Sequence, residues 1–459
     1  MQVTPLREAP EDIGLANAAE HYYPQLSATL NLLLSRSDKA SSEFNPGTLL
    51  PELTPRVRDF FSVSGLAFSR LGEYKGKHLS LLNLAQNPGT RTTKTLASLV
   101  TVARAVRFIQ DTGERVMILT PSSANKATAM RDAVLRAVEA GLVTPEQLSV
   151  SAVVPRSSTP KLWASRLNDD PELQARNPVA VFPGAEPSDV KALARHVVDH
   201  YAAPLKDATG VNLWYTLDLD NYMAADVMRA FAEAELFPAT TSRLHVHAVS
   251  SAYGLLGHAR GHELLDESRR KELPEPHYLL VQHLGTPDMV LSLYRGGTDR
   301  DLLPTYHHDD RLGLFVQHED PRFPSTTLDP DEVLDTTFYT RKPPTSARMN
   351  ELIRTQGGGG IVVSLHECLT RYAQSRALLR QGGVTVPADP RALREWSLVM
   401  AVTGLLNAID RGLVAEDDVL VHGSGCYGVD DFTPLAPAAL HTVHDGDMLR
   451  DVVFKAAEA

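Results

Sequence analysis

The sequence has little of what marks secreted, metal-bound or membrane proteins. Its two cysteines, Cys368 and Cys426, exclude a disulfide framework and a four-thiolate metal site, and they favour a reducing compartment. No apolar run approaches the roughly 20 residues that span a bilayer. The first residues, 1–5, are not a basic stretch leading into an apolar core. We therefore expect a cytoplasmic protein that does not bind a membrane.

Basic residues are also in deficit. Lys and Arg number 45 against 56 Asp and Glu, which gives a formal charge of −11. We therefore expect no electrostatic binding of nucleic acid. The 459 residues are 43% hydrophobic and 22% charged, ordinary values for a globular chain of two or three domains.

What the sequence does have is a repeated alternation of apolar strand patterns and helix-spaced segments. This alternation predicts an α/β fold with parallel sheets, in which ligands bind at loops that follow the carboxyl ends of strands. Residues 284–345 break the pattern and are predicted to be an irregular insertion with one short strand at 289–294. The glycines at 357–360 are predicted to form a flexible turn. The strand patterns lie at 78–84, 115–119, 148–154, 178–182, 211–217, 244–249, 278–282, 361–364 and 418–421.

Two of the loops that follow strand patterns lead into helices. The loop 87–94, Asn-Pro-Gly-Thr-Arg-Thr-Thr-Lys, places Lys94 at a helix start. There the helix dipole disfavours a cation, and with desolvation it would lower the pKa of the amine and suit it to nucleophilic chemistry. The loop 120–125, Thr-Pro-Ser-Ser-Ala-Asn, is either an ordinary helix cap or a carboxylate-binding helix start.

Two further loops are rich in small residues. The loop 250–254, Ser-Ser-Ala-Tyr-Gly, would let backbone N–H groups approach a phosphate at a helix amino end. The loop 422–428, His-Gly-Ser-Gly-Cys-Tyr-Gly, is either a plain glycine turn or a place where the backbone approaches a flat ring closely.

In this order the four loops resemble those of fold-type II pyridoxal 5′-phosphate (PLP) enzymes, the tryptophan-synthase-β-like superfamily that includes threonine, cysteate and cysteine synthases. The likeness covers roughly residues 75–285 and 350–430. It implies two parallel-sheet α/β domains with the cofactor between them. The large cofactor domain would comprise 1–94 and 202–459, and the small mobile substrate domain 95–201.

The resemblance also implies a role for each loop. Lys94 would be the catalytic Schiff-base lysine, and either His422 (strict alignment) or Ser424 (a one-step shift) would face the pyridine nitrogen. A neutral partner there favours elimination and replacement over transamination. The phosphate loop has one glycine where the family has three or four, and Ala124 stands where the family has glycine. The remaining implied contacts are Asn125 to the ring oxygen, Ser250, Ser251, Ala252, Tyr253 and Gly254 to the phosphate, and Thr120, Ser122, Ser123 and Asn125 to the substrate carboxylate.

These expectations define a PLP-dependent lyase or transferase that acts on an amino acid by β- or γ-elimination or replacement. Specialised amino-acid metabolism and a homodimer are part of the same expectation. The alternative is a non-catalytic paralogue that binds a ligand or partner, motivated by the altered phosphate loop and the insertion. We expect no metal site, because 307–310 lacks ligand spacing and His258 and His262 lack a third ligand.

Overall fold

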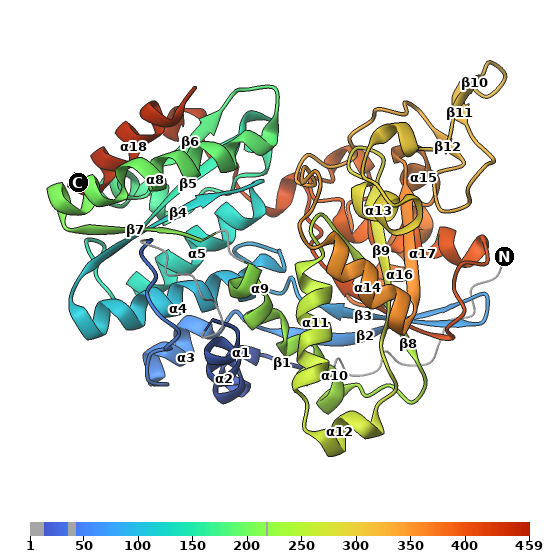
Figure 1. Ribbon diagram of the computed structural model, residues 1–459, viewed down its shortest axis with the longest axis horizontal. Helices are drawn as coiled ribbons and strands as arrows, with labels where there is room; N and C mark the ends of the chain where they lie inside the picture. Colours follow the sequence, from blue (N-terminus) through green and yellow to red (C-terminus); the bar gives the residue numbers. More distant parts are fainter. Residues whose placement is uncertain (1–12, 35–42, 217–218) are drawn as a thin grey trace. The chain divides into compact units, whose positions relative to one another are not determined.

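The computed structural model describes residues 13–34, 43–216 and 219–459, which divide into two compact units (Figure 1). Unit 1 comprises the described part of Met1–Leu15 with Leu66–Ala85 and Arg229–Val429. Unit 2 comprises Ala16–Gly65, Gln86–Met228 and Asp430–Ala459, and the predicted small domain, 95–201, falls inside it. Each unit contains an α/β sheet with parallel strands, which confirms the predicted fold class.

Unit 1 is built on a seven-stranded sheet of order β1-β2-β3-β14-β8-β9-β13. The three strands at one end pair in antiparallel fashion, and the other pairs are parallel. A small three-stranded sheet, β10-β11-β12, accompanies it. The strands are β1 (Ile13–Leu15), β2 (Leu66–Tyr74), β3 (Lys77–Asn83), β8 (Arg243–Ala248), β9 (His277–His283), β10 (His307–Asp309), β11 (Leu314–Val316), β12 (Thr326–Thr327), β13 (Gly358–Val363) and β14 (Asp418–Gly423).

Both faces of this large sheet are buried, as expected for parallel strands. Leu279 and Val281 of β9 pack into the core that holds α17. The alternate residues Tyr278 and Leu280 pack on the opposite face against α11, α13 and α14. The unit 1 helices are α10 (Met228–Leu236), α11 (Tyr253–Leu264), α12 (Glu267–Glu272), α13 (Asp288–Arg295), α14 (Ser346–Gln356), α15 (Leu365–Thr370), α16 (Tyr372–Gln381) and α17 (Ser397–Asp410).

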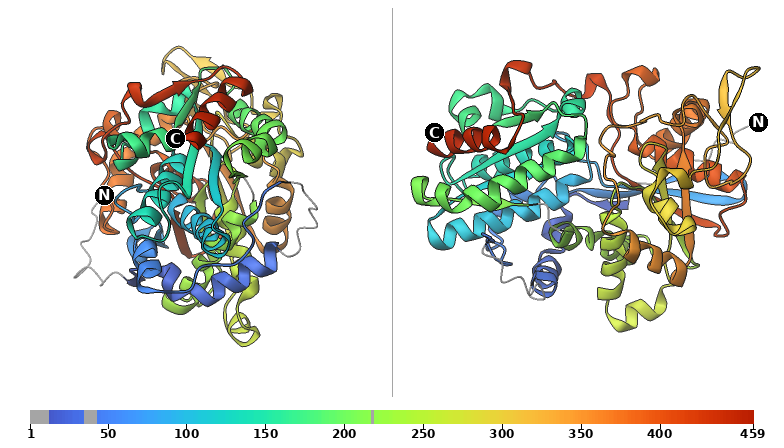
Figure 2. Two further views of the ribbon diagram at one scale, coloured as in Figure 1. Left: turned by 90° about the vertical axis from the view of Figure 1, so that its left-hand side faces the viewer. Right: turned by 45° about the horizontal axis from the view of Figure 1, so that its top comes forward.

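Unit 2 contains a five-stranded, all-parallel sheet of order β15-β6-β5-β4-β7. Helices α8 and α18 lie side by side in it (Figure 2). The strands are β4 (Arg115–Pro121), β5 (Leu148–Pro155), β6 (Val179–Phe182), β7 (Val211–Tyr215) and β15 (Leu440–Thr442). The helices include α1 (Ala18–His21), α2 (Tyr23–Leu34), α3 (Pro55–Phe61), α4 (Lys94–Thr112), α5 (Asn125–Glu139), α6 (Arg166–Asp169), α7 (Pro171–Arg176), α8 (Val190–Thr209), α9 (Leu219–Asp226) and α18 (Gly446–Glu458).

The strand predicted at 289–294 is wrong, because Asp288–Arg295 forms helix α13. The Gln282 side chain accepts hydrogen bonds from the backbone N–H groups of Met289 (2.9 Å) and Val290 (3.0 Å), so a side chain from the preceding strand, β9, caps the first turn. Gly296 ends the helix in a left-handed conformation. Five of the eight residues of α13 are buried, so this part of the insertion belongs to the core.

The glycine run is also not a flexible turn. Gly358–Gly360 open strand β13 and pair in parallel with Tyr278–Leu280 of β9. A Cβ at Gly358 would lie 2.0 Å from the carbonyl oxygen of Tyr278, so glycine is required by close approach of the two strands. Within the described residues, no helix is both long and apolar enough to cross a membrane.

Candidate functional site

Lys94 is the first residue of α4, and a turn built by Asn87 precedes it. The Asn87 side chain accepts from the backbone N–H of Gly89 (2.9 Å) and donates to Asp132 (2.8 Å). Its backbone carbonyl accepts from the N–H of Arg91 (2.8 Å), which adopts φ +43°. That left-handed conformation is costly for a side chain with a Cβ, and such strain concentrates at functional loops.

Two amino groups lie near one aromatic ring in unit 2. The Nζ atom of half-buried Lys94 is 5.7 Å from the centre of the Tyr222 ring, and that of buried Lys126 is 5.3 Å from it. Lys126 also donates to the carbonyl of Thr216 at 3.2 Å. Sequence analysis identified Lys94 and missed Lys126 and Tyr222, because nothing in the spacing of residues 94, 126 and 222 shows that they meet.

Ser122 caps helix α5. Its hydroxyl accepts from the backbone N–H groups of Ala124 (3.1 Å) and Ala127 (2.8 Å). Ala124 itself has φ +96° and ψ −60°, a conformation that side chains with a Cβ rarely adopt. The ordinary helix-cap interpretation therefore holds for Ser122, and the strain at Ala124 falls where the resembling family has glycine.

Two unpartnered threonine hydroxyls lie at the end of the unit 2 sheet. The register pairs Leu119 of β4 with Tyr215 of β7, so Thr120 and Thr216 follow at corresponding positions of neighbouring strands. Both Oγ1 atoms are buried without a hydrogen-bond partner among the described residues. Ser123 and Asn125, on the same loop as Thr120, are partly exposed.

In unit 1, the loop Ser250–Gly254 leads from β8 into α11. Ala252 precedes the helix with φ +52°, and its carbonyl accepts from Leu256 N–H at 3.0 Å. The Ser250 hydroxyl is buried and has no partner in the part of the chain that the structure describes. The neighbouring Ser251 is partly exposed, and its carbonyl accepts from the Thr345 hydroxyl at 2.7 Å. Tyr253, also partly exposed, begins the helix.

The last predicted loop follows β14 in the same unit. His422 is fully buried within that strand, and Ser424 lies just beyond its end. Ser424 is 8% exposed, and its Oγ has no hydrogen-bond partner among the residues described. Since β14 pairs with β8, the loops that carry Ser424 and Ser250 leave adjacent strands.

A chain of buried polar side chains runs through α10, β8, α11 and β14. Arg229 Nη1 donates to His422 Nδ1 at 3.2 Å, and His422 Nε2 lies 3.0 Å from His245 Nδ1. Glu233 lies at the other end of this chain, and its Oε1 is 3.7 Å from His245 Nε2, an ion-pair distance. Its second oxygen, Oε2, is 2.7 Å from His258 Nε2. We call this group the relay (Arg229, His422, His245, Glu233 and His258). Sequence analysis named His422 and His258 but missed the other three and the contacts that join them.

The tautomers of the relay follow from arginine, which only donates. His422 Nδ1 must accept from Arg229, so a neutral His422 carries its proton on Nε2 and donates to His245. His245 then carries its proton on Nε2, toward Glu233. We assign these protons from the hydrogen-bond pattern, and the pattern directs the donors of the relay toward one carboxylate.

Burial lowers the pKa of His245 and of His422 well below the usual histidine value, so both rings are neutral. Burial alone would raise the pKa of Glu233. The neighbouring imidazole N–H groups of His245 and His258, and an ion pair with Arg243 (2.7 Å), hold it below its ordinary value instead. Glu233 is therefore the ionised centre of the relay.

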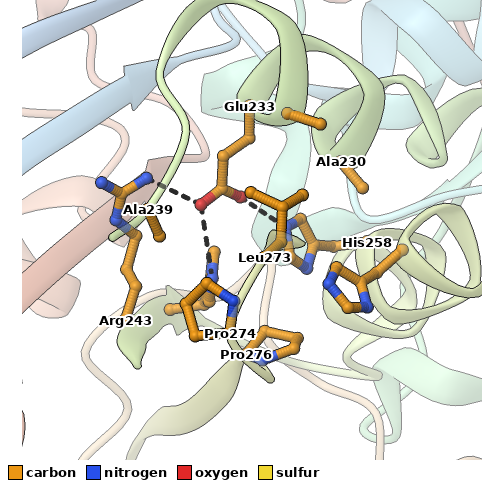
Figure 3. A pocket seen from close by; sticks show the side chains of 11 residues that line it. Ala230, Glu233, Ala239, Arg243, His258, Leu273, Pro274 and Pro276 are labelled. Atoms are coloured by element: carbon orange, nitrogen blue, oxygen red, sulfur yellow. Dashed lines mark hydrogen bonds and ion pairs between the residues drawn. The ribbon is translucent and has the colours of Figure 1, made fainter. Parts of the chain in front are cut away.

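A cavity of about 20 Å³ adjoins the relay, room for about one water molecule. Glu233 lines this cavity, and Figure 3 shows dashed lines from its carboxylate to Arg243 and His258, with Pro274 and Pro276 also lining the cavity.

The nitrogens of His245, His258 and His422 lie within 4.8 Å of one another, close enough to hold a metal ion. Sequence analysis treated His258 as an ordinary helix residue without a third ligand, because strand partners of a helix are not visible from spacing. In the structure each of these ring nitrogens faces a partner already, His258 Nδ1 being 2.9 Å from the Tyr278 hydroxyl. We therefore interpret the three rings as parts of a hydrogen-bond relay.

Comparison with solved structures gives distant likenesses. A PLP-bound threonine synthase from Brucella melitensis is 12% identical, over 83% of this chain and 79% of that chain, with a TM-score of 0.49. An O-acetylserine-dependent cystathionine β-synthase from Helicobacter pylori is 14% identical over 84% and 99%, with a TM-score of 0.46. Maize serine racemase is 13% identical over 77% and 85%, with a TM-score of 0.42. At these TM-scores we take no residue role or reaction from them.

None of the curated proteins matches the sequence significantly. A protein-family model matches residues 14–457, nearly the whole chain. The chain belongs to that family, which is described as a family of unknown function (DUF6002).

Proposed function

We propose that this protein binds PLP and acts on an amino acid by β- or γ-elimination or replacement. One observation carries the proposal. The hydroxyls of Thr120, Ser250 and Ser424 are buried without a partner in the described structure, and each stands in a loop expected to bind cofactor or substrate. A buried unpaired hydroxyl is costly, and a polar ligand that bonds to these three hydroxyls would offset that cost.

Each of the predicted loops has its own part in the proposed chemistry. Lys94 would hold the cofactor covalently through its amino group, with Asn125 at the ring oxygen. The Thr120–Asn125 loop would bind the substrate carboxylate, with Thr120, Ser122, Ser123 and Asn125 as donors. The Ser122 hydroxyl accepts from the helix backbone and keeps its own O–H to donate. The loop Ser250–Gly254 would hold the phosphate through Ser250, Ser251 and the N–H groups that open α11.

For the pyridine nitrogen we propose Ser424 rather than His422. Both ring nitrogens of His422 are engaged, with Arg229 and His245, whereas Ser424 Oγ has no partner in the described residues. When bound, PLP supplies an electron sink for the α-carbon of an amino acid. A neutral serine weakens that sink and favours elimination and replacement, and Lys94 Nζ would move the α-proton.

The test is the visible absorption spectrum of the protein after addition of PLP, for wild type and Lys94→Ala. We expect an imine band in the wild type and a free-aldehyde spectrum in the variant. Lys126→Gln is the matched control, because Lys126 lies against the same Tyr222 ring, and it should retain the band. No band in the wild type would contradict the proposal. A band lost only in Lys126→Gln would move the attachment to Lys126.

The resemblance leads us to propose a homodimer, and the composition leads us to propose a cytoplasmic protein without nucleic acid partners. Sedimentation equilibrium tests the homodimer directly, since a dimer has about twice the 50.2 kDa mass of the chain. A mass of one chain at micromolar concentration would contradict it.

A further inference from the structure

Arg229 lies against the loop expected to bind phosphate, although it comes from a different element, α10. A Cβ placed on Gly254 would meet the Arg229 guanidinium at 2.6 to 2.7 Å, from its two terminal nitrogens and its central carbon. The guanidinium therefore covers the backbone of Gly254, in the first turn of α11. Arg229 is 1% exposed, so this charge is withdrawn from bulk water.

This position is electrostatically unusual. The amino end of a helix carries about half a positive charge from its unpaired N–H groups, and a cation there is disfavoured. Helix α11 has 12 residues, and its N-cap residue, Ala252, supplies no side-chain hydrogen bond to the amino end. A buried guanidinium and a helix amino end that face one another are both stabilised by an anion that contacts both.

The relay fixes Arg229 in this place. Its Nη1 donates to His422 Nδ1, and His422 in turn donates to His245 on the side of Glu233. Since His422 is neutral and accepts, it orients the guanidinium without cancelling its charge. Arginine stays protonated in proteins, so the Arg229 guanidinium brings a positive charge beside the first turn of α11.

Two hydroxyls near this turn independently indicate a ligand. Ser250 Oγ lies in the loop itself, and Ser424 Oγ lies beyond the adjacent strand β14. Each is buried without a partner within the described ranges. The Ser250 hydroxyl can donate to a phosphate oxygen, and the Ser424 hydroxyl is the one proposed for the ring nitrogen of the same ligand.

We propose that Arg229 is the phosphate-binding cation of unit 1, held by His422, and that it replaces the glycine N–H groups that the loop Ser250–Gly254 lacks. The phosphate monoester would be that of PLP, so the inference rests on the proposed function for the identity of the ligand. His422 is then a positioning residue, and Gly254 leaves room for the guanidinium, which a Cβ at this position would force to shift.

The experiment uses a ligand that cannot react with a lysine. Pyridoxine 5′-phosphate and pyridoxine share the PLP ring without its aldehyde, and they differ from one another in the phosphate alone. Isothermal titration calorimetry gives the affinity of the whole protein for each. In Arg229→Gln we expect the affinity for pyridoxine 5′-phosphate to fall roughly ten- to hundredfold, as for loss of a charged hydrogen bond, with pyridoxine unchanged.

Three variants sharpen the result. Arg229→Lys should restore part of the lost affinity, because it restores the charge. Gly254→Ala should displace the guanidinium and lower the preference for the phosphate form with Arg229 still present. Arg131→Gln removes another buried arginine, which donates to the carbonyl of Asn177 in unit 2, and should leave the preference unchanged.

The outcomes separate this inference from the proposed function. Equal preference for the phosphate form in wild type, Arg229→Gln and Gly254→Ala would overturn the assignment of Arg229, whether or not Lys94 holds PLP. Loss of the preference in those variants, in a protein that shows no imine band with PLP, would support Arg229 as a phosphate ligand and contradict the proposed function. If Arg229→Gln does not fold, Gly254→Ala decides the question.

Discussion

Ser122 and Thr120 stand two residues apart on one loop, yet their hydroxyls do different things. Ser122 Oγ accepts two backbone N–H groups at the start of α5, whereas Thr120 Oγ1 is buried with no partner among the described residues. Ser122→Ala should lower the free energy of unfolding by about 1–2 kcal/mol through loss of the cap.

Thr120→Val is the contrasting change. It keeps the shape and removes only an unpaired hydroxyl, so we expect a free energy of unfolding within about 0.5 kcal/mol of wild type or above it. Urea unfolding of both variants without ligand measures the contrast. Equal losses in the two variants would show that Thr120 has a structural partner and would remove one support of the proposed function.

Ala124 stores backbone strain that glycine would relieve. At φ +96° and ψ −60° a Cβ costs about 1–3 kcal/mol, while glycine adds about 0.4–1 kcal/mol of unfolded-state entropy. Ala124→Gly should therefore raise the free energy of unfolding by about 1 kcal/mol, measured by urea unfolding. Ala252→Gly, at φ +52°, should change it little, because the smaller strain and the entropy nearly cancel. A lower free energy of unfolding in Ala124→Gly would contradict the claim that the backbone at Ala124 is strained.

At the scale of elements, strands β8 and β14 carry neutral, buried histidines. The folded pKa values of His245 and His422 lie well below the unfolded value of about 6.5. Below that pH the unfolded chain binds more protons than the folded one. Stability is therefore full above about pH 6.5 and falls as pH decreases, by up to about 1.4 kcal/mol per pH unit for each ring.

Urea unfolding between about pH 7.5 and 5 tests this dependence. His245→Asn should be less stable than wild type at the upper pH, because it breaks the relay, and its stability should fall less steeply with acid. A pH slope equal to that of wild type would show that His245 does not titrate on unfolding.

The local sequence pattern predicted much of the order of helices and strands. It did not predict the elements whose conformation depends on contacts with a neighbouring strand. The helix α5 and the strands β4, β5 and β8 follow from apolar spacing and turn residues, and they lie where the sequence predicts them. Helix α13 does not, because its first turn is capped by Gln282 from β9. Likewise, Gly358–Gly360 become a strand only because β9 lies alongside.

For the whole molecule, the order of the motifs located the candidate loops but not the buried residues that pack against those loops. Lys94 and the loop Ser250–Gly254 were predicted from motif order, and their functional roles stay predictions. Arg229, Glu233 and His245 were missed, because they meet through pairing of β8 with β14 and packing of two helices. Such convergence is a property of the tertiary fold and leaves no periodic signal in the chain.

Ligand binding should also be visible in the stability of the whole chain. PLP at about 100 times its dissociation constant stabilises the folded state by about 2.7 kcal/mol, so the unfolding temperature should rise on its addition. Lys94→Ala should reduce this rise in unfolding temperature, and the single variant Arg229→Gln should reduce it more than Lys94→Ala does. An unfolding temperature unaffected by PLP would contradict cofactor binding; differential scanning calorimetry measures it.

The central claim is that PLP attaches to Lys94. The most direct measurement is to add PLP, reduce with borohydride, digest the protein and locate the pyridoxyl group by mass spectrometry. We predict that the group is found on the peptide that contains Lys94, and that a large excess of pyridoxine 5′-phosphate suppresses the labelling. Labelling at Lys126 in place of Lys94, scattered labelling of surface lysines that pyridoxine 5′-phosphate does not suppress, or no labelling would contradict the account.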